Sequence, residues 1–259
     1  MAQDVWNPKQ YDQFKEQRSQ PFFDLMNLLI QTKTPRVADL GCGTGELTAQ
    51  LSQHLKASET IGIDTSDAML EMAKSYQTDH LKFQKADIEN WNPEKQFDVI
   101  CSNAALQWCS DHARLFESLT KHLAPQGQIA IQMPMNFDYP THTLAGIMSK
   151  ETHWANLLGH EAREPGMKML KVEEYARLLF KLGFQEQKVF LRVYGHVLDS
   201  RESVIEWVKG TTLNFVKSRL SDIDYQKFVS EYRERLFQVL PDDKPFFYPF
   251  KRVLIWGRR

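Results

Sequence analysis

The glycine-rich stretch Val37-Ala-Asp-Leu-Gly-Cys-Gly-Thr-Gly45 is the feature that most limits what this chain can fold into. A short run typical of a buried strand leads into Gly41, Gly43 and Gly45, and a helical pattern begins at Glu46. Glycines at such a turn permit positive φ angles and let the backbone approach a ligand. The start of the following helix offers free N–H groups and the positive end of its dipole. The stretch predicts either a bare strand–helix turn or the ligand-binding turn of a dinucleotide-binding fold.

Short β-rich runs alternate with helical patterns through the first half of the chain. Such alternation is typical of βαβ units with a parallel sheet, right-handed crossovers and ligands at the carboxyl ends of the strands. The sequence predicts strands at 36–40, 60–63, 81–84, 97–102 and 128–133, and helices at 46–56, 67–76 and 111–123.

The alternation loosens after residue 133, where the sequence predicts two insertions that form a helical cap over the active site. The predicted cap comprises 134–170 and 199–249, and the predicted main domain comprises 1–133, 171–198 and 250–259. Further elements are expected as helices at 143–150, 172–182 and most of 201–240, and as strands at 186–198 and 251–256. The segment 11–31 is expected to hold one or two helices, with a break at Pro21.

Composition and charge argue against several classes of protein. The chain has 259 residues, of which 42% are hydrophobic, and its formal net charge of −1 argues against a nucleic-acid binder with a basic body. It holds no run of 18 apolar residues and does not begin with a signal-peptide pattern, so we expect a cytoplasmic protein without a membrane partner. Cys42, Cys101 and Cys109 form no C-x-x-C pair, and histidines show no ligand spacing, so reduced thiols and no metal site are expected.

Two acidic residues sharpen the interpretation of the glycine turn. Asp64 ends the second strand, where a carboxylate suits the hydroxyls of a ribose, and NAD enzymes share this feature. Asp87 follows the third strand beside the apolar Ile88, where an acceptor can bind the amino group of an adenine, which favours S-adenosylmethionine over NAD. The spacing G-x-G-x-G after Asp39 also differs from G-x-G-x-x-G. A helix-capping aspartate at Asp64 and a solvated turn aspartate at Asp87 are the simpler alternatives.

These motifs resemble those of class I S-adenosylmethionine-dependent methyltransferases. The resemblance rests on VADLGCGTG, IGIDTSDAML and KADIENW within residues 36–133. A narrower resemblance, to carboxyl methyltransferases of small polycarboxylic acids such as trans-aconitate, extends over nearly the whole chain, although 166–171 departs from it. It is carried by 6–22, 102–112, 131–144, 162–165, 204–211 and 248–252. The resemblance implies a Rossmann-like, doubly wound, mostly parallel seven-stranded sheet, with S-adenosylmethionine as methyl donor and S-adenosylhomocysteine as product.

The resemblance also implies which residues hold the cofactor. It places the methionine moiety at the glycine turn, the ribose at the end of the second strand and the adenine near the third. The implied contacts are Gly41 and Gly43 for the methionine moiety, Asp64 for the ribose, Met69, Asp87 and Ile88 for the adenine, Asn103 for the amino group through its main chain, and Arg18 with Tyr11 for the carboxylate. Met69 fits equally as a packed residue of its helix.

The chemistry of methyl transfer agrees with a carboxylic acid as acceptor. A carboxyl group has a pKa of about 4 and is ionised at pH 7, so it needs no general base. The sequence shows no strong base constellation, and after the fourth strand it reads Asn103-Ala-Ala-Leu106, not the Asn-Pro-Pro-Tyr associated with amino-nitrogen methylation. We therefore expect no catalytic side chain beyond positioning, which can supply roughly 7–11 kcal/mol of such a barrier.

A small polyanionic substrate calls for cations in a closed pocket. Residues 200–259 hold 12 basic and 8 acidic side chains, a net charge of +4, as an anion-receiving cap or merely solvated helix faces would. The candidate substrate contacts are Trp108, Arg163, Tyr194 and Arg252, with Lys251, Tyr139 and His142 as further possibilities. A monomer is expected. Three alternatives remain. The enzyme could methylate another acceptor, such as a malonyl thioester; the chain could be an NAD oxidoreductase; or it could bind the cofactor without catalysis.

Overall fold

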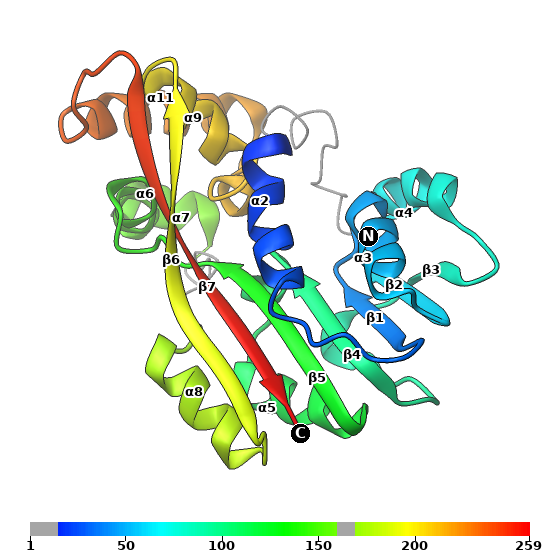
Figure 1. Ribbon diagram of the computed structural model, residues 1–259. Coiled ribbons are helices and arrows are strands. Elements are labelled where there is room, and N and C mark those ends of the chain that lie inside the picture. Colours follow the sequence, from blue (N-terminus) through cyan, green and yellow to red (C-terminus); the bar gives the residue numbers. More distant parts are fainter. Residues whose placement is uncertain (1–14, 160–168) are drawn as a thin grey trace. The chain divides into compact units, whose positions relative to one another are not determined.

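The computed structural model describes residues 15–159 and 169–259, which form two compact units (Figure 1). The sheet unit comprises 15–134, 169–192 and 252–259 of the described residues, and the helical unit comprises 135–159 and 193–251. The chain passes from one unit to the other inside two long strands, β6 (Glu186–Leu198) and β7 (Phe246–Arg258). Two of the observed boundaries, 192/193 and 251/252, fall within strands, whereas we expected β6 to belong wholly to the main domain; a third, 134/135, lies where the first insertion was expected to begin.

A seven-stranded sheet runs in the order β3-β2-β1-β4-β5-β7-β6, as predicted for a doubly wound fold (Figure 1). Strands β1 to β5 are parallel, and β7 pairs antiparallel with β5. The central strands are apolar and buried on both faces, as parallel sheets require. The parallel strands are β1 (Arg36–Leu40), β2 (Glu59–Asp64), β3 (Leu81–Lys85), β4 (Phe97–Asn103) and β5 (Leu123–Pro134).

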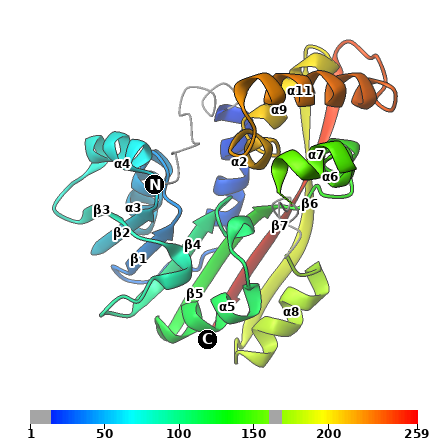
Figure 2. The same cartoon turned by 180° about the vertical axis from the view of Figure 1, so that it is seen from behind.

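Helices cover the two faces of this sheet. Helices α2 (Lys15–Met26) and α3 (Glu46–Leu55) pack on one face, with Phe22 and Leu51 in one core cluster with strand residues. Helices α5 (His112–Lys121) and α8 (Val172–Lys181) lie on the other face (Figure 2) and meet through the Phe116 and Tyr175 rings. Shorter pieces join the strands: α4 (Asp67–Ala73), η1 (Lys74–Tyr76), η2 (Ile88–Asn90) and η3 (Leu106–Trp108).

Three expectations depart furthest from the structure. Helix α2 continues through Pro21, because the buried Pro21 and its apolar neighbours offset the one hydrogen bond that proline removes. Strand β5 begins at Leu123 instead of Gln128, with a register irregularity opposite Phe97 and Val99. Strand β7 begins at Phe246 instead of Lys251, because alternate residues from Phe246 onward are buried, the pattern of a half-buried strand.

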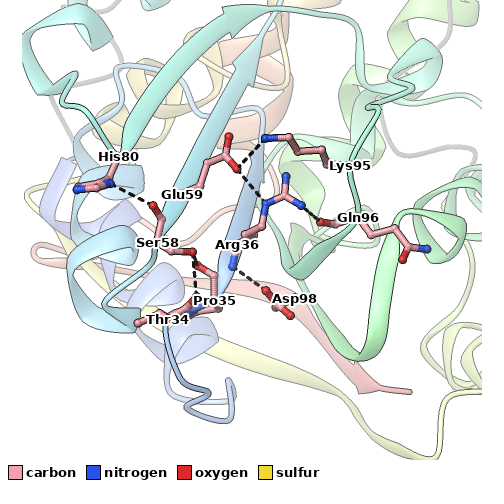
Figure 3. A network of polar contacts seen from close by, with 9 residues as sticks. All are labelled: Thr34, Pro35, Arg36, Ser58, Glu59, His80, Lys95, Gln96 and Asp98. Carbon is pink, nitrogen blue, oxygen red and sulfur yellow. Dashed lines mark hydrogen bonds and ion pairs between the residues drawn. The ribbon is translucent and has the colours of Figure 1, made fainter.

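A polar network ties together the amino-terminal ends of β1, β2 and β4 (Figure 3). The Arg36 N–H donates to Asp98 Oδ2 at 2.7 Å, and the Arg36 guanidinium donates to Glu59 Oε2 at 2.9 Å and to the Gln96 carbonyl at 2.6 Å.

The hydrogen bond from Arg36 lowers the pKa of Glu59, and Lys95 adds a second ion pair to Glu59 at 3.6 Å. Further bonds join Ser58 to Thr34 and Pro35, and His80 to Ser58. The network fixes strand register at the edge of the sheet opposite to the glycine turn.

The helical unit has its own aromatic core. Trp154, Trp207, Phe246 and Tyr248 are buried in this core, whereas Phe247 is 59% exposed. The helices of this unit are α6 (Pro140–Lys150), α7 (Thr152–Leu158), α9 (Arg201–Lys209), α10 (Asn214–Lys217) and α11 (Asp222–Phe237). In the described ranges of the chain, no helix is both long and apolar enough to cross a membrane.

His142 is buried in this unit and bonded through both ring nitrogens. Its Nδ1 bonds Thr141 Oγ1 at 2.9 Å and its Nε2 bonds Thr212 Oγ1 at 3.0 Å. The Thr141 hydroxyl also bonds the Tyr248 hydroxyl at 3.0 Å, and the Tyr232 hydroxyl donates to the Thr141 carbonyl. Because burial disfavours the imidazolium, the pKa of His142 is lowered to about 4. Both ring nitrogens have partners inside the unit, which argues against a contact of His142 with substrate.

This histidine is expected to make the helical unit less stable in weak acid. The unfolded chain takes up a proton at His142 below pH 6.5, but the folded chain does so only near pH 4, so stability falls as pH falls through this window. The loss reaches about 3 kcal/mol at the lower end. Urea unfolding followed by tryptophan fluorescence from pH 7 to pH 4.5 measures it. His142→Gln, which keeps hydrogen-bonding groups but cannot titrate, should show a flatter profile, and equal slopes would contradict the expectation.

Candidate active site

The glycine turn lies at the carboxyl end of β1 and combines close packing with open space. The N–H groups of Gly41 and Cys42 donate to the Ile63 carbonyl at 2.8 and 2.9 Å, which holds the turn against β2. Gly41 has φ +78°, and a Cβ added there would lie 2.2 Å from Ala105 Cβ. Gly43 has φ +54°, and apart from Gly43 and its two chain neighbours no described atom lies within 4 Å of the position its Cβ would take. Gly41 therefore seals the turn against the loop after β4, and Gly43 leaves room for a ligand.

Asp64 faces this turn from the end of β2. Its carboxylate is half-buried, Oδ2 accepts from the Gly43 N–H at 2.9 Å, and Oδ1 accepts from the Ser66 N–H at 2.9 Å. Each oxygen keeps a lone pair for a further donor. The N-cap of α4 is Ser66, whose hydroxyl accepts from the Met69 N–H, so the helix-capping alternative does not describe Asp64. The carboxylate is thus oriented beside the open space at Gly43.

The residues expected to contact an adenine follow β2 and β3. Asp87 is exposed and caps η2, since it accepts from the Glu89 N–H at 3.1 Å and the Asn90 side chain at 2.6 Å. Ile88 reaches toward the glycine turn, with its Cδ1 3.8 Å from the position of a Cβ on Gly41. Met69 is buried in α4. The structure places Ile88 next to the turn, and it gives Asp87 the local bonds of a turn aspartate.

Asp39 anchors the helix that starts at the glycine turn. Its carboxylate is buried and accepts a hydrogen bond of 2.6 Å from Thr48 Oγ1 on α3. Burial is the main cause that raises the pKa of Asp39 to about 6, and the bond from Thr48 opposes it. Asp39 therefore ties the end of β1 to α3 and orients the loop between them.

The end of β4 holds a buried acceptor that the rest of the described structure leaves unused. Asn103 Oδ1 is closed to solvent and has no hydrogen-bond partner among the described residues. Ala104 follows it with φ +55°, a left-handed conformation that is uncommon for residues other than glycine. The Gln132 carbonyl accepts from the Ala104 N–H, and the Ala104 carbonyl accepts from Gln107 Nε2 at 2.7 Å. Backbone strain of this kind clusters at ligand sites, but no sequence pattern signals it at an alanine.

The cysteines near this edge do not present reactive thiolates. Cys42, Cys101 and Cys109 are free and buried. Burial is the largest cause that raises the pKa of each thiol, to about 12 for Cys109. A thiol in this state is a poor nucleophile at neutral pH.

The candidate substrate residues are distributed over both units. Trp108 on η3 is 40% exposed, and the buried Arg252 on β7 donates from Nη1 to Gln132 Oε1 at 3.3 Å; both lie in the sheet unit. Tyr194 is buried on the part of β6 that belongs to the helical unit. Lys251, on β7, belongs to the same unit and forms an ion pair with Asp138.

Three predicted contacts cannot be placed. Tyr11 and Arg163 lie outside the described residues, and Arg18 belongs to α2, but its side chain is not among those described. Among the placed residues, the structure brings Gly41, Gly43, Asp64, Ile88 and Asn103 to one edge of the sheet.

Known proteins share both the sequence and the fold of this chain. A family model described as a methyltransferase domain matches residues 37–127, from β1 into β5. The trans-aconitate 2-methyltransferase of Deinococcus radiodurans is 40% identical over 98% of this chain and 98% of its own length. The trans-aconitate 2-methyltransferase of Shigella dysenteriae serotype 1 is 36% identical with the same coverage of both chains.

Solved structures agree on the fold. The YcgJ protein of Bacillus subtilis has a TM-score of 0.62 at 17% identity and covers 93% of this chain and 98% of its own. Phosphoethanolamine N-methyltransferase 2 of Haemonchus contortus, in complex with S-adenosyl-L-methionine, has a TM-score of 0.55 at 18% identity over 93% of this chain and 52% of its own. The level of identity to the curated relatives over nearly full length confirms the resemblance found in the sequence: the chain belongs to the family of trans-aconitate 2-methyltransferases, within the class I S-adenosylmethionine-dependent methyltransferases.

Proposed function

We propose that this protein transfers the methyl group of S-adenosylmethionine to one carboxylate of a small polycarboxylic acid, with trans-aconitate as the first candidate, and releases a monomethyl ester. The curated relatives with 36–40% identity carry the name of this activity over 98% of the chain. The observation that carries the proposal is the arrangement at the carboxyl edge of the sheet, where the Asp64 carboxylate is oriented beside the open space at Gly43.

The residues at this edge fit the cofactor. The open space at Gly43 suits the methionine moiety, and the lone pairs left on Asp64 suit the two ribose hydroxyls. The buried Asn103 Oδ1 suits the ammonium group, which is a donor, so we assign this contact to the side chain in addition to the main chain. Met69, Asp87 and Ile88 would border the adenine, and Tyr11 and Arg18 would close over the carboxylate. When bound, the cofactor supplies a methyl group already activated on a sulfonium.

The chain's own contribution to the reaction is alignment and exclusion of water. A carboxylate acceptor is ionised at neutral pH and needs no proton removed. No base is assigned to His112: its Nδ1 bonds the Tyr175 hydroxyl at 2.7 Å, and burial, the largest cause, lowers the pKa of its ring, which makes it a weaker base. We therefore propose that Trp108, Arg163, Tyr194 and Arg252 position the acid, with arginine supplying the planar donors that match a carboxylate.

A transfer assay tests the proposal directly. The protein is incubated with methyl-labelled S-adenosylmethionine and, in separate reactions, trans-aconitate, citrate or a malonyl thioester. Base-labile label on trans-aconitate is the expected result, because methyl esters hydrolyse in base. A preference for the thioester would replace the acceptor but keep carboxyl methylation. Cofactor binding without label on any acid would contradict the proposal and favour a binding module.

A further inference from the structure

Two glutamines on β5 differ in a way that points to a ligand. Gln128 and Gln132 are both fully buried, and because they are four residues apart on one strand they face the same side of the sheet. The Gln128 amide is satisfied: Oε1 accepts from the Ile30 N–H and from Trp256 Nε1, both at 2.9 Å, and Nε2 donates to the Ile30 carbonyl at 2.7 Å. Gln128 therefore fastens the segment after α2 to the sheet.

Within the described structure, only the oxygen of the Gln132 side-chain amide has a hydrogen-bond partner. Its Oε1 accepts from Arg252 Nη1. A guanidinium can only donate, so this bond fixes which end of the amide is the oxygen. The other end, Nε2, is closed to solvent and has no partner in the described ranges. Buried donors are nearly always paired in folded proteins, so an orphaned donor calls for an explanation.

The location of this donor separates it from the proposed ribose contact. Gln132 is the register partner of Asn103 on β4, and Arg252 lies opposite Pro134 at the same edge, on β7. Neighbouring strands are about 4.8 Å apart, so Gln132 on β5 lies roughly 10 Å across the sheet from β1, on the side away from β2 and Asp64. The neighbouring Asn103 presents an acceptor, Oδ1, whereas Gln132 presents a donor. The two amides thus suit groups of opposite kind.

We propose that Gln132, oriented by Arg252, is a specificity-determining residue that binds a carboxylate of the acid substrate through Nε2. This inference rests on the proposed function. The donor end of the amide and the guanidinium would both face the carboxylate oxygens, while Asn103 Oδ1 receives the cofactor's ammonium. The methionine moiety of the cofactor also carries a carboxylate, and the test must separate these two sources.

Calorimetry on three variants tests the assignment. Gln132→Glu keeps the acceptor for Arg252 but replaces the donor with a second oxygen, and Gln132→Met removes the amide. We expect trans-aconitate, titrated into protein saturated with S-adenosylhomocysteine, to bind at least tenfold more weakly to both variants. S-adenosylhomocysteine itself should bind within twofold of the parent protein. Gln128→Met is the matched control: it should lower the unfolding midpoint and leave the affinity for trans-aconitate within twofold.

The possible outcomes are distinct. Weaker binding of S-adenosylhomocysteine with unchanged binding of the acid would assign Gln132 to the cofactor and overturn the inference. If Gln132→Glu protein unfolds at the parent's temperature and binds both S-adenosylhomocysteine and trans-aconitate as the parent does, the inference about Gln132 is also overturned. Methyl transfer by the parent protein would still uphold the proposed function in that case. A parent protein that neither binds nor methylates any of the acids would overturn the proposed function and this inference with it.

Discussion

Replacing Asp64 with alanine is expected to weaken binding of S-adenosylmethionine by roughly 10- to 150-fold, equivalent to about 1.5–3 kcal/mol for hydrogen bonds to a charged group. Two losses combine in this variant. The proposed bonds to the ribose hydroxyls disappear, and the Gly43 N–H loses the acceptor that holds the turn at 2.9 Å. Methyl transfer at low cofactor concentration should fall by a similar factor.

Titration calorimetry with S-adenosylmethionine measures the effect, and two further variants define its cause. Asp64→Asn keeps one carbonyl oxygen and removes the charge, so an intermediate loss is expected. Asp67→Ala removes an exposed carboxylate three residues along the chain, whose partner is the exposed Lys85, and should leave affinity unchanged. Alanine at position 64 with the parent's affinity would exclude the ribose assignment.

The fold could be predicted because its signals are local. A strand, a glycine turn and an amphipathic helix follow one another within 20 residues, and buried parallel strands need continuous apolar runs. The errors arose where tertiary packing overrides a local rule. Pro21 lies inside a helix that the sheet supports, and the run from Phe246 belongs to a strand that was expected to begin only at residue 251.

The site could be predicted only in part, because local sequence does not show hydrogen-bond partners. Gln128 and Gln132 look alike as polar residues in the apolar strand 128–133. The difference between them comes from Ile30 and Trp256, which lie 98 and 128 positions away from Gln128 in the chain. For the same reason, the sequence could not show that both ring nitrogens of His142 are bonded to threonine hydroxyls.

Alanine substitutions at Gly41 and Gly43 should separate folding from cofactor binding, although the two residues lie in one turn. At Gly41 the new Cβ would meet Ala105 Cβ at 2.2 Å, so the turn and the loop after β4 must move apart. Overpacking costs about 1–3 kcal/mol, and the left-handed backbone adds about 1–2 kcal/mol. We expect Gly41→Ala to be destabilised by roughly 2–5 kcal/mol and to lose methyl transfer.

Gly43→Ala should behave differently because its Cβ would enter open space. The left-handed conformation alone costs about 1–2 kcal/mol, so the variant should fold with a modest loss of stability. The added methyl group would occupy the space proposed for the methionine moiety, so binding of S-adenosylmethionine should become too weak for calorimetry to detect. Urea unfolding and calorimetry on both variants measure the two effects. If Gly43→Ala binds the cofactor as the parent does, the space beside Gly43 is not the methionine site.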